Sequence, residues 1–190
     1  MKLDSETEEK LKKIALSYLV KGKPGWDVPH TMSTVYWMKR LLGKEDGDER
    51  ILVSTMYLHD IGYFGSFKKG YTKADVDNLG ILHMQRGSQE AEKILKRLRY
   101  TPKEIKEITH LISMHGYLEQ ASTHNEILVV EADGLGQVDI DRVKPTYTKE
   151  DYLKFLDVFE KRRVPKYKTK LGKYYLKRLI KKAREYVEGM

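Results

Sequence analysis

The chain has 190 residues, which is enough for one compact domain with a sizeable hydrophobic core. It contains no cysteine, and this excludes a Cys nucleophile, a thiolate metal site and a disulfide framework. Any metal ion would therefore be held by nitrogen and oxygen ligands.

The formal net charge of +8 is concentrated at the end of the chain. Residues 161–190 hold twelve Lys and Arg against two Glu, a net of +10, so the first 160 residues are slightly acidic. The start, MKLDSETEEK, lacks the apolar core of a signal peptide, and no run approaches the roughly 18 apolar residues of a membrane span. We therefore expect a cytoplasmic protein that does not contact a membrane.

The chain is predicted to be helical almost throughout, because apolar residues recur at the spacing of one helix face. In chain order, helices are predicted over residues 5–20, 27–42, 48–60, 81–98, 101–115 and 125–135, with two more starting at Thr148 and near Thr169. Residues 62–80, rich in Gly and aromatic residues, are predicted to be irregular. No strand-like alternation or internal repeat stands out, so the predicted fold class is all-α.

Two of these helices carry clear start signals. Asp27 is predicted to be the N-cap of the second helix, with Pro29 in the first turn. The sequence TPKE, residues 101–104, is a capping box with Pro in the first turn of the fifth helix. We expect residues 1–145 to form one helical bundle and residues 146–190 to form a basic helical extension packed on the same domain.

The histidines follow a pattern that argues against isolated core or surface roles. His59 and Asp60 are adjacent at the end of the third predicted helix. Because neighbouring residues on a helix point about 100° apart, they can share a metal only over the groove between them. Imidazole and carboxylate are suitable ligands for a divalent ion of intermediate hardness, and the two oxygens of Asp60 could bridge two ions.

This order of residues resembles the HD superfamily of metal-dependent phosphohydrolases, whose pattern is H…HD…D within a helical bundle. His30 in WDVPHTMSTVYWMKRLL matches the first histidine, LHDIG matches the paired motif, and Asp133 in VVEADGLG supplies the last aspartate. The resemblance covers about residues 25–140. It implies a single HD-domain helical bundle with additional C-terminal helices.

The resemblance also implies the ligands of two metal ions. His83 and His115 match the two extra histidines of members that hold two metals. The first ion would be held by His30, His59, Asp60 and Asp133. The second would be held by His83 and His115, with Asp60 bridging. Mn, Fe, Co or Ni would suit these ligands, and Mg fits less well.

The implied activity is hydrolysis of a nucleotide or another small phosphate ester by metal-activated water, with Asp60 and Arg86 as catalytic residues. Phosphate also calls for cations. Arg86 lies one turn beyond His83 and could clamp a phosphate bidentately. Lys68, Lys69 and Lys73 follow the HD pair and are candidates for substrate binding, although each of the four could equally be a solvated surface cation.

Position 63 is Tyr, so the chain departs from the subset of the family that reads HDIGK, and the GYP signature of that subset is also absent. Cyclic-dinucleotide hydrolysis is therefore not implied. A di-iron oxygenase of the HD type is an alternative, because a few bimetallic members use the same ligands to activate oxygen.

A nucleotide-sensing module with a nucleic-acid-binding tail is another alternative. The tail interleaves cations with tyrosines that could stack on bases, at Tyr167, Tyr174, Tyr175 and Tyr186. It also carries an apolar stripe, made of Leu171, Tyr174, Tyr175, Leu176, Leu179 and Ile180. The stripe favours packing on the bundle or on a second subunit, so nucleic acid is not favoured and a homo-oligomer is possible.

Overall fold

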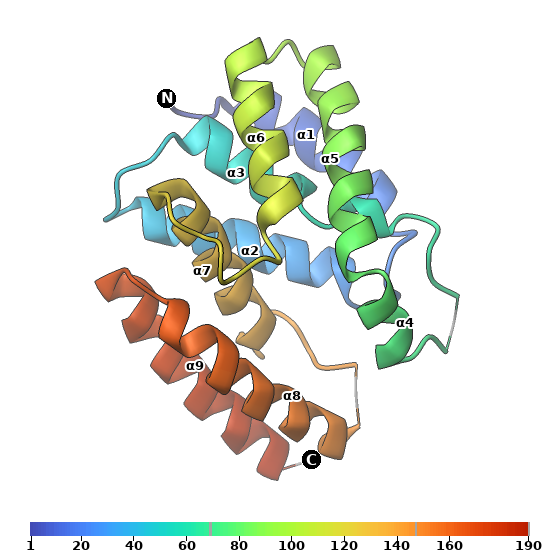
Figure 1. Ribbon diagram of the computed structural model, residues 1–190, viewed down its shortest axis with the longest axis vertical. Coiled ribbons are helices and arrows are strands. Elements are labelled where there is room, and N and C mark those ends of the chain that lie inside the picture. Colours follow the sequence, from blue (N-terminus) through green and yellow to red (C-terminus); the bar gives the residue numbers. More distant parts are fainter. Residues whose placement is uncertain (69, 147, 190) are drawn as a thin grey trace.

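The computed structural model of the protein describes residues 1–68, 70–146 and 148–189, which are helical with no strand among them (Figure 1). This confirms the predicted all-α fold. The α-helices are α1 (Ser5–Leu19), α2 (Asp27–Leu42), α3 (Glu49–Leu58), α4 (Lys73–Asn78), α5 (Gly80–Arg97), α6 (Pro102–Met114), α7 (His124–Val138), α8 (Lys149–Arg163) and α9 (Lys170–Glu188). Two 3₁₀ turns, η1 (Ile61–Tyr63) and η2 (Val164–Lys166), follow α3 and α8.

Helices α2 and α7 pack against each other at the centre of the molecule. The α5–α6 pair lies on one side of them and the α8–α9 pair on the other (Figure 1). One hydrophobic core connects these layers, with buried side chains that include Met38 on α2, Leu52 on α3, Leu128 on α7 and Leu176 on α9. This arrangement brings the ends of α3 and α6 close to the middle of α7.

Side-chain caps account for several helix starts. The predicted capping box of α6 is present, since Thr101 accepts a hydrogen bond from the Glu104 amide and Glu104 accepts one from the Thr101 amide. The prediction that Asp27 caps α2 is wrong. Asp27 is the first residue of that helix, and its carboxylate instead accepts a hydrogen bond from the backbone amide of Lys23, 2.6 Å away.

The stretch predicted to be irregular contains a short helix, α4, so that prediction is wrong in part. Thr72 caps α4, accepting a hydrogen bond from the Asp75 amide, while the Asp75 carboxylate accepts one from the Thr72 amide. The pattern of this capping box is present in the sequence, but the glycines and aromatic residues around it favoured the prediction of an irregular segment.

The apolar face of α9 packs on α7 and on α8, and its buried residues include Leu176, Leu179 and Val187. Tyr174 is the exception within the predicted stripe, since it is 53% exposed. Tyr167 does not lie on the surface as a base-stacking role would require, because it is buried and its hydroxyl donates a hydrogen bond to the Glu131 carbonyl. The domain boundary at residue 145 stays a prediction.

Glu131 of α7 joins the central helix to the start of α9. Its buried carboxylate accepts hydrogen bonds from the backbone amides of Lys168 and Thr169 and from the Thr169 hydroxyl. Glu131→Ala should lower the free energy of unfolding by about 2–3 kcal/mol, because these donors would lose their acceptor. Urea unfolding measures this difference.

Glu185→Ala is the control, since this carboxylate of α9 is exposed. It should change the free energy of unfolding by less than about 0.5 kcal/mol. Equal effects of the two substitutions would show that Glu131 does not anchor α9.

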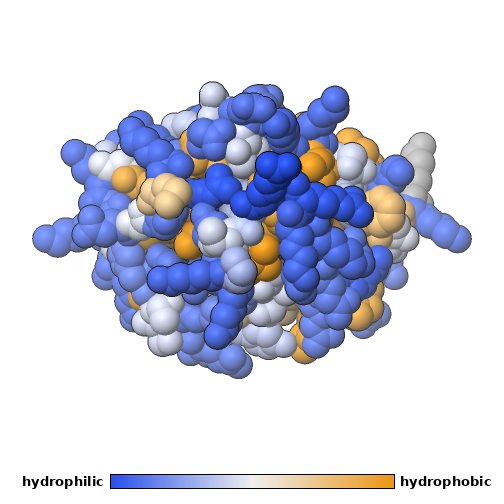
Figure 2. Space-filling model, turned by 90° about the horizontal axis from the view of Figure 1, so that it is seen from above, coloured by the Kyte–Doolittle hydropathy of each residue, from blue (hydrophilic) through white to orange (hydrophobic). Residues whose placement is uncertain are grey.

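None of the helices in the described ranges is long and apolar enough to cross a membrane. Seen from the end where α5 and α6 meet, the surface is mostly hydrophilic, with hydrophobic residues scattered between hydrophilic ones (Figure 2). A homo-oligomer stays a prediction.

Candidate metal centre

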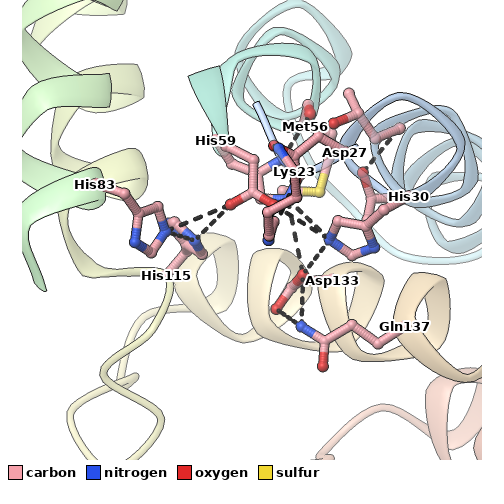
Figure 3. Close-up of polar contacts among 12 residues, drawn as sticks. Lys23, Asp27, His30, Met56, His59, His83, His115, Asp133 and Gln137 are labelled. Atoms are coloured by element: carbon pink, nitrogen blue, oxygen red, sulfur yellow. Dashed lines mark hydrogen bonds and ion pairs between the residues drawn. The ribbon is translucent and has the colours of Figure 1, made fainter. Parts of the chain in front are cut away.

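The six side chains predicted to be metal ligands meet at one place, between α2, the ends of α3 and α6, the start of α5, and α7. They form two groups (Figure 3). All six are buried: His30, His59, Asp60, His83, His115 and Asp133. Their role as metal ligands stays a prediction, which the geometry below supports.

The first group consists of His30, His59 and Asp133. The Nε2 atom of His30 lies 3.2 Å from Nε2 of His59 and 3.1 Å from Oδ1 of Asp133. The distance from His59 Nε2 to the same Asp133 oxygen is 3.7 Å. Three donor atoms, from α2, from the residue that follows α3 and from α7, thus surround one point.

The second group consists of Asp60, His83 and His115. The Nε2 atoms of the two histidines lie 3.3 Å apart. Oδ1 of Asp60 is 3.4 Å from the Nε2 of His83 and 3.7 Å from that of His115.

Asp60 connects the two groups through its two oxygens. Oδ1 belongs to the second group, and Oδ2 lies 3.7 Å from His30 Nε2 and 3.6 Å from His59 Nε2 in the first. The helix α3 ends at Leu58, and the backbone of Asp60 has left the helical conformation, with φ −103° and ψ 2°. This change of backbone direction allows the adjacent His59 and Asp60 side chains to converge.

Gly62 fixes the distance between the HD pair and α5. A Cβ at this position would collide with the backbone of His83 and of Gly87. A glycine is therefore needed for η1 to lie against α5, and this contact brings Asp60 within reach of His83.

Three of the histidines are oriented by backbone carbonyls. The Nδ1 atoms of His59, His83 and His115 lie 2.8, 3.2 and 2.7 Å from the carbonyl oxygens of Met56, Leu79 and Ile112. An Nδ1–H that donates to these carbonyls leaves a lone pair on Nε2 of the neutral ring.

The positions of these lone pairs indicate whether the residues of the site fit a metal ion. In the second group, the Nε2 atoms of His83 and His115 face each other at 3.3 Å, so two neutral rings with Nδ1–H would set lone pair against lone pair, and either a shared metal ion or a proton on one Nε2 relieves this. The nearby carboxylate oxygens add negative charge. Imidazole nitrogens combined with carboxylate oxygens suit a divalent transition metal, so the residues present fit the predicted ions.

The ionisation of the site is also suited to cation binding. Burial lowers the pKa of His59 to about 4, which keeps its ring neutral. Burial alone would raise the pKa of Asp60 and Asp133, but Lys23 beside the first and Arg163 beside the second hold both values well below the usual range. His115 differs: burial alone would lower its pKa, but the neighbouring Asp60 carboxylate outweighs burial and raises it.

Lys23 is a site residue that sequence reasoning missed. Its side chain is buried in the connection between α1 and α2, with Nζ 3.1 Å from Asp27 Oδ1 and 3.6 Å from Asp60 Oδ2. The same ammonium lies 4.0 Å from the centroid of the Tyr63 ring. No motif in the sequence connects Lys23 to the HD pair, because the fold of the α1–α2 connection creates the contact.

Arg163, the last residue of α8, was also missed. Its Nη1 lies 2.9 Å from Oδ2 of Asp133, and Gln137 Nε2 lies 3.1 Å from the same oxygen. These contacts hold Asp133 with Oδ1 toward the histidines. The C-terminal extension therefore contributes directly to the centre.

Arg86 has different contacts from those expected of a phosphate clamp. Its guanidinium donates hydrogen bonds to Ser66 Oγ at 2.8 Å and to the Phe64 carbonyl at 3.0 Å. It thus holds the loop after the HD pair, and it does not line the cavity at the centre.

Of the three lysines predicted to bind substrate, one lies away from the cavity, and the side chains of the other two lie outside the described part of the structure. Lys68 is exposed and is not among the cavity residues. Lys69 lies outside the described residues, and so does the side chain of Lys73, the first residue of α4. Phosphate binding by Arg86, Lys68, Lys69 and Lys73 stays a prediction.

A cavity of about 690 Å³ opens over the metal centre. Five of the six candidate ligands line it, and His59 lies behind them. Its walls come mainly from α8, the start of α5 and residues 115–118, with further residues from α4, from α7 and from the connection between α1 and α2. Its cationic side chains are Lys23, Lys154, Arg162 and Arg163. This volume is in the range of small-molecule sites.

Comparison with known proteins agrees with this geometry. Residues 28–136 match the family model described as HD domain. The chain is 30% identical over 129 residues to the protein named "Putative phosphohydrolase YueE" of Bacillus subtilis (strain 168), an alignment that covers 65% of this chain and 71% of that protein. No solved structure matches the chain. The family match spans more than half of the sequence and includes both groups of histidines and aspartates, so the chain belongs to the HD domain family of metal-dependent phosphohydrolases.

Proposed function

We propose that this protein uses two divalent transition-metal ions to hydrolyse a nucleotide or another small phosphate ester. The observation that carries the proposal is Asp60, whose two carboxylate oxygens each face a different pair of histidines beside an open cavity. Membership of the HD domain family and the name of the Bacillus subtilis relative support the same reaction class.

In this proposal each group holds one ion, and Asp60 serves both. The first ion has His30, His59, Asp60 and Asp133 as ligands, and the second has His83, His115 and Asp60. Divalent ions there supply an activated water and neutralise charge on the phosphate. Mn, Fe, Co and Ni suit this mixture of nitrogen and oxygen better than Mg, which prefers an all-oxygen environment.

The buried ammonium of Lys23 is positioned to bind a phosphate oxygen. It lines the cavity, and two of its neighbours, Asp27 and Asp60, limit where it can point. Burial alone would lower the pKa of Lys23, but the carboxylates of Asp60 and Asp27 outweigh burial and raise it, so the group is charged at neutral pH. A fixed cation beside the reacting phosphate lowers the free energy of a transition state in which negative charge accumulates.

The activity is tested by removing metals from the purified protein and adding back Mn²⁺, Fe²⁺, Co²⁺, Ni²⁺ or Mg²⁺ singly. Phosphate release is then measured from nucleoside mono-, di- and triphosphates and from p-nitrophenyl phosphate. We expect release that depends on a transition metal. An absence of release from every substrate with every metal would contradict the proposed function.

Lys23→Gln should lower kcat/KM by about 10²-fold, or about 2.7 kcal/mol, while both metal ions stay bound. The substitution removes a charged hydrogen-bond donor to phosphate but no metal ligand. Steady-state kinetics and metal analysis of the same preparation measure the two quantities. Lys21→Gln is the control, since Lys21 is exposed two residues away. If Lys23→Gln and Lys21→Gln had equal kinetics, Lys23 would have no role in phosphate binding.

A further inference from the structure

Helix α8 faces the cavity with two rows of side chains. Residues spaced by four lie on the same side of a helix. One row is formed by Asp151, Phe155, Phe159 and Arg163. The adjacent row is formed by Lys154, Val158 and Arg162. All of these side chains line the cavity, so α8 is one of its walls.

The direction of this wall is set by Arg163. Its contact with Asp133 places the end of α8 at the metal centre. Asp151 lies twelve residues earlier, which corresponds to about 18 Å along the helix. A substrate whose phosphate lies at the centre would therefore extend its organic group along α8.

The middle of the wall is apolar. Val158 and Ile81 come from α8 and α5, line the same cavity, and are each 55% exposed. Phe155, which is half-buried, lies one turn before Phe159. Exposed aliphatic surface on two elements of one cavity is unfavourable in water, and an apolar ligand would cover it.

The outer end of the wall is polar again. The Lys154 ammonium lies 3.7 Å from a carboxylate oxygen of Asp151, and both side chains are exposed. The apolar stretch is therefore short, which suits a compact ring with a polar edge better than a long aliphatic chain. A bare sugar would place hydroxyl groups against Phe155 and Val158, where they would lack hydrogen-bond partners.

On the basis of the proposed function, we propose that Ile81, Phe155 and Val158 form a subsite for the organic group of the substrate, and that this group contains a planar aromatic ring such as a nucleobase. The ring packs against Phe155 and the two aliphatic side chains. Its polar edge points toward Asp151 and Lys154. The C-terminal extension thus determines substrate specificity.

The subsite is tested by calorimetry with phosphonate analogues, in which a methylene group replaces the ester oxygen and prevents hydrolysis. Analogues of the four common nucleoside 5′-monophosphates are compared with the analogue of ribose 5-phosphate, in which a hydroxyl group stands in place of the base. At least one base-bearing analogue should bind the metal-loaded protein about tenfold more tightly. Equal affinity of all five would overturn the proposal.

Two variants test whether the preference for a base-bearing analogue depends on the residues of the subsite. Phe155→Ala and Val158→Ser should each reduce the affinity for the base-bearing analogue by about three- to tenfold and leave that for the ribose analogue unchanged. Val158 is exposed, so its replacement does not threaten folding. Val20→Ser is the matched control, because Val20 is 65% exposed and lies outside the cavity.

A preference for the base that survives both substitutions would overturn the assignment to α8. The result is separate from the proposed function, because binding of the analogues does not require hydrolysis. Hydrolysis without any preference for a base would reject the subsite alone. A preference without hydrolysis of any ester would reject the proposed function alone.

Discussion

Asp60→Asn should abolish hydrolysis and weaken metal binding in both groups at once. An asparagine keeps the size of the side chain but has one carbonyl oxygen and no charge, so it cannot serve two cations. We expect turnover to fall by at least about 10³-fold, which corresponds to the loss of about 4 kcal/mol of transition-state stabilisation. Metal content after equilibrium dialysis and initial rates of phosphate release measure the two effects.

Asp139→Asn is the matched control for this substitution. Asp139 is also buried, but its carboxylate accepts a hydrogen bond from the Trp37 indole at 3.0 Å and belongs to neither histidine group. This variant should keep its metals. An Asp60→Asn protein that kept two ions and full turnover would show that Asp60 does not bridge.

His83→Ala and His115→Ala should each lower the metal stoichiometry from about two to one. Either change leaves the second group with one imidazole and one shared carboxylate, whereas the first group keeps its four ligands. We expect turnover to fall by about 10²-fold or more, because phosphate would lose the charge of one ion. Metal analysis at increasing free Mn²⁺ distinguishes a lost site from a weakened one.

His110→Ala is the control for these histidine variants. His110 is exposed, lies outside both groups and pairs with Glu126 at 2.8 Å. It should leave stoichiometry and rate unchanged. If His83→Ala and His115→Ala also retained two ions and the wild-type rate, the second group would have no catalytic role.

The positions of the clustered residues could be predicted because each lies in a short recognisable segment. The HD pair followed by Ile-Gly is one such segment, and its glycine has a physical reason in the contact of η1 with α5. His115 is the last residue of the fifth predicted helix, and α6 ends at this point, with His115 as its C-cap. Local sequence thus encoded which side chains lie at the helix ends.

The cations of the cavity could not be predicted in the same way. Helical spacing places Arg86 near the face of His83, but spacing does not reveal which neighbour a long side chain meets, and here it meets the loop at Phe64 and Ser66. Lys23 and Arg163 reach the centre from a connection and from a distant helix. These contacts form only when the helices pack together, so they cannot be predicted from the sequence around Lys23 or Arg163.

In the C-terminal tail, too, the sequence indicates some features of the structure and not others. Its net charge suggested a basic surface, and the apolar stripe suggested packing of the last helix. Both features describe α9, whose buried face lies on α7. Helix α8 lines the cavity with side chains spaced four residues apart, and these include both aromatic and charged residues. An ordinary half-exposed helix has the same mixture, so the sequence does not identify α8 as a cavity wall.

A crystal structure of the Mn²⁺-loaded protein, with the ions located by anomalous scattering, tests the central claim most directly. We predict two anomalous peaks about 3.5–4 Å apart, one on each side of the Asp60 carboxylate. The first peak should be ligated by His30, His59 and Asp133, and the second by His83 and His115. A single peak in saturating Mn²⁺, or two peaks that Asp60 does not connect, would contradict the two-metal centre.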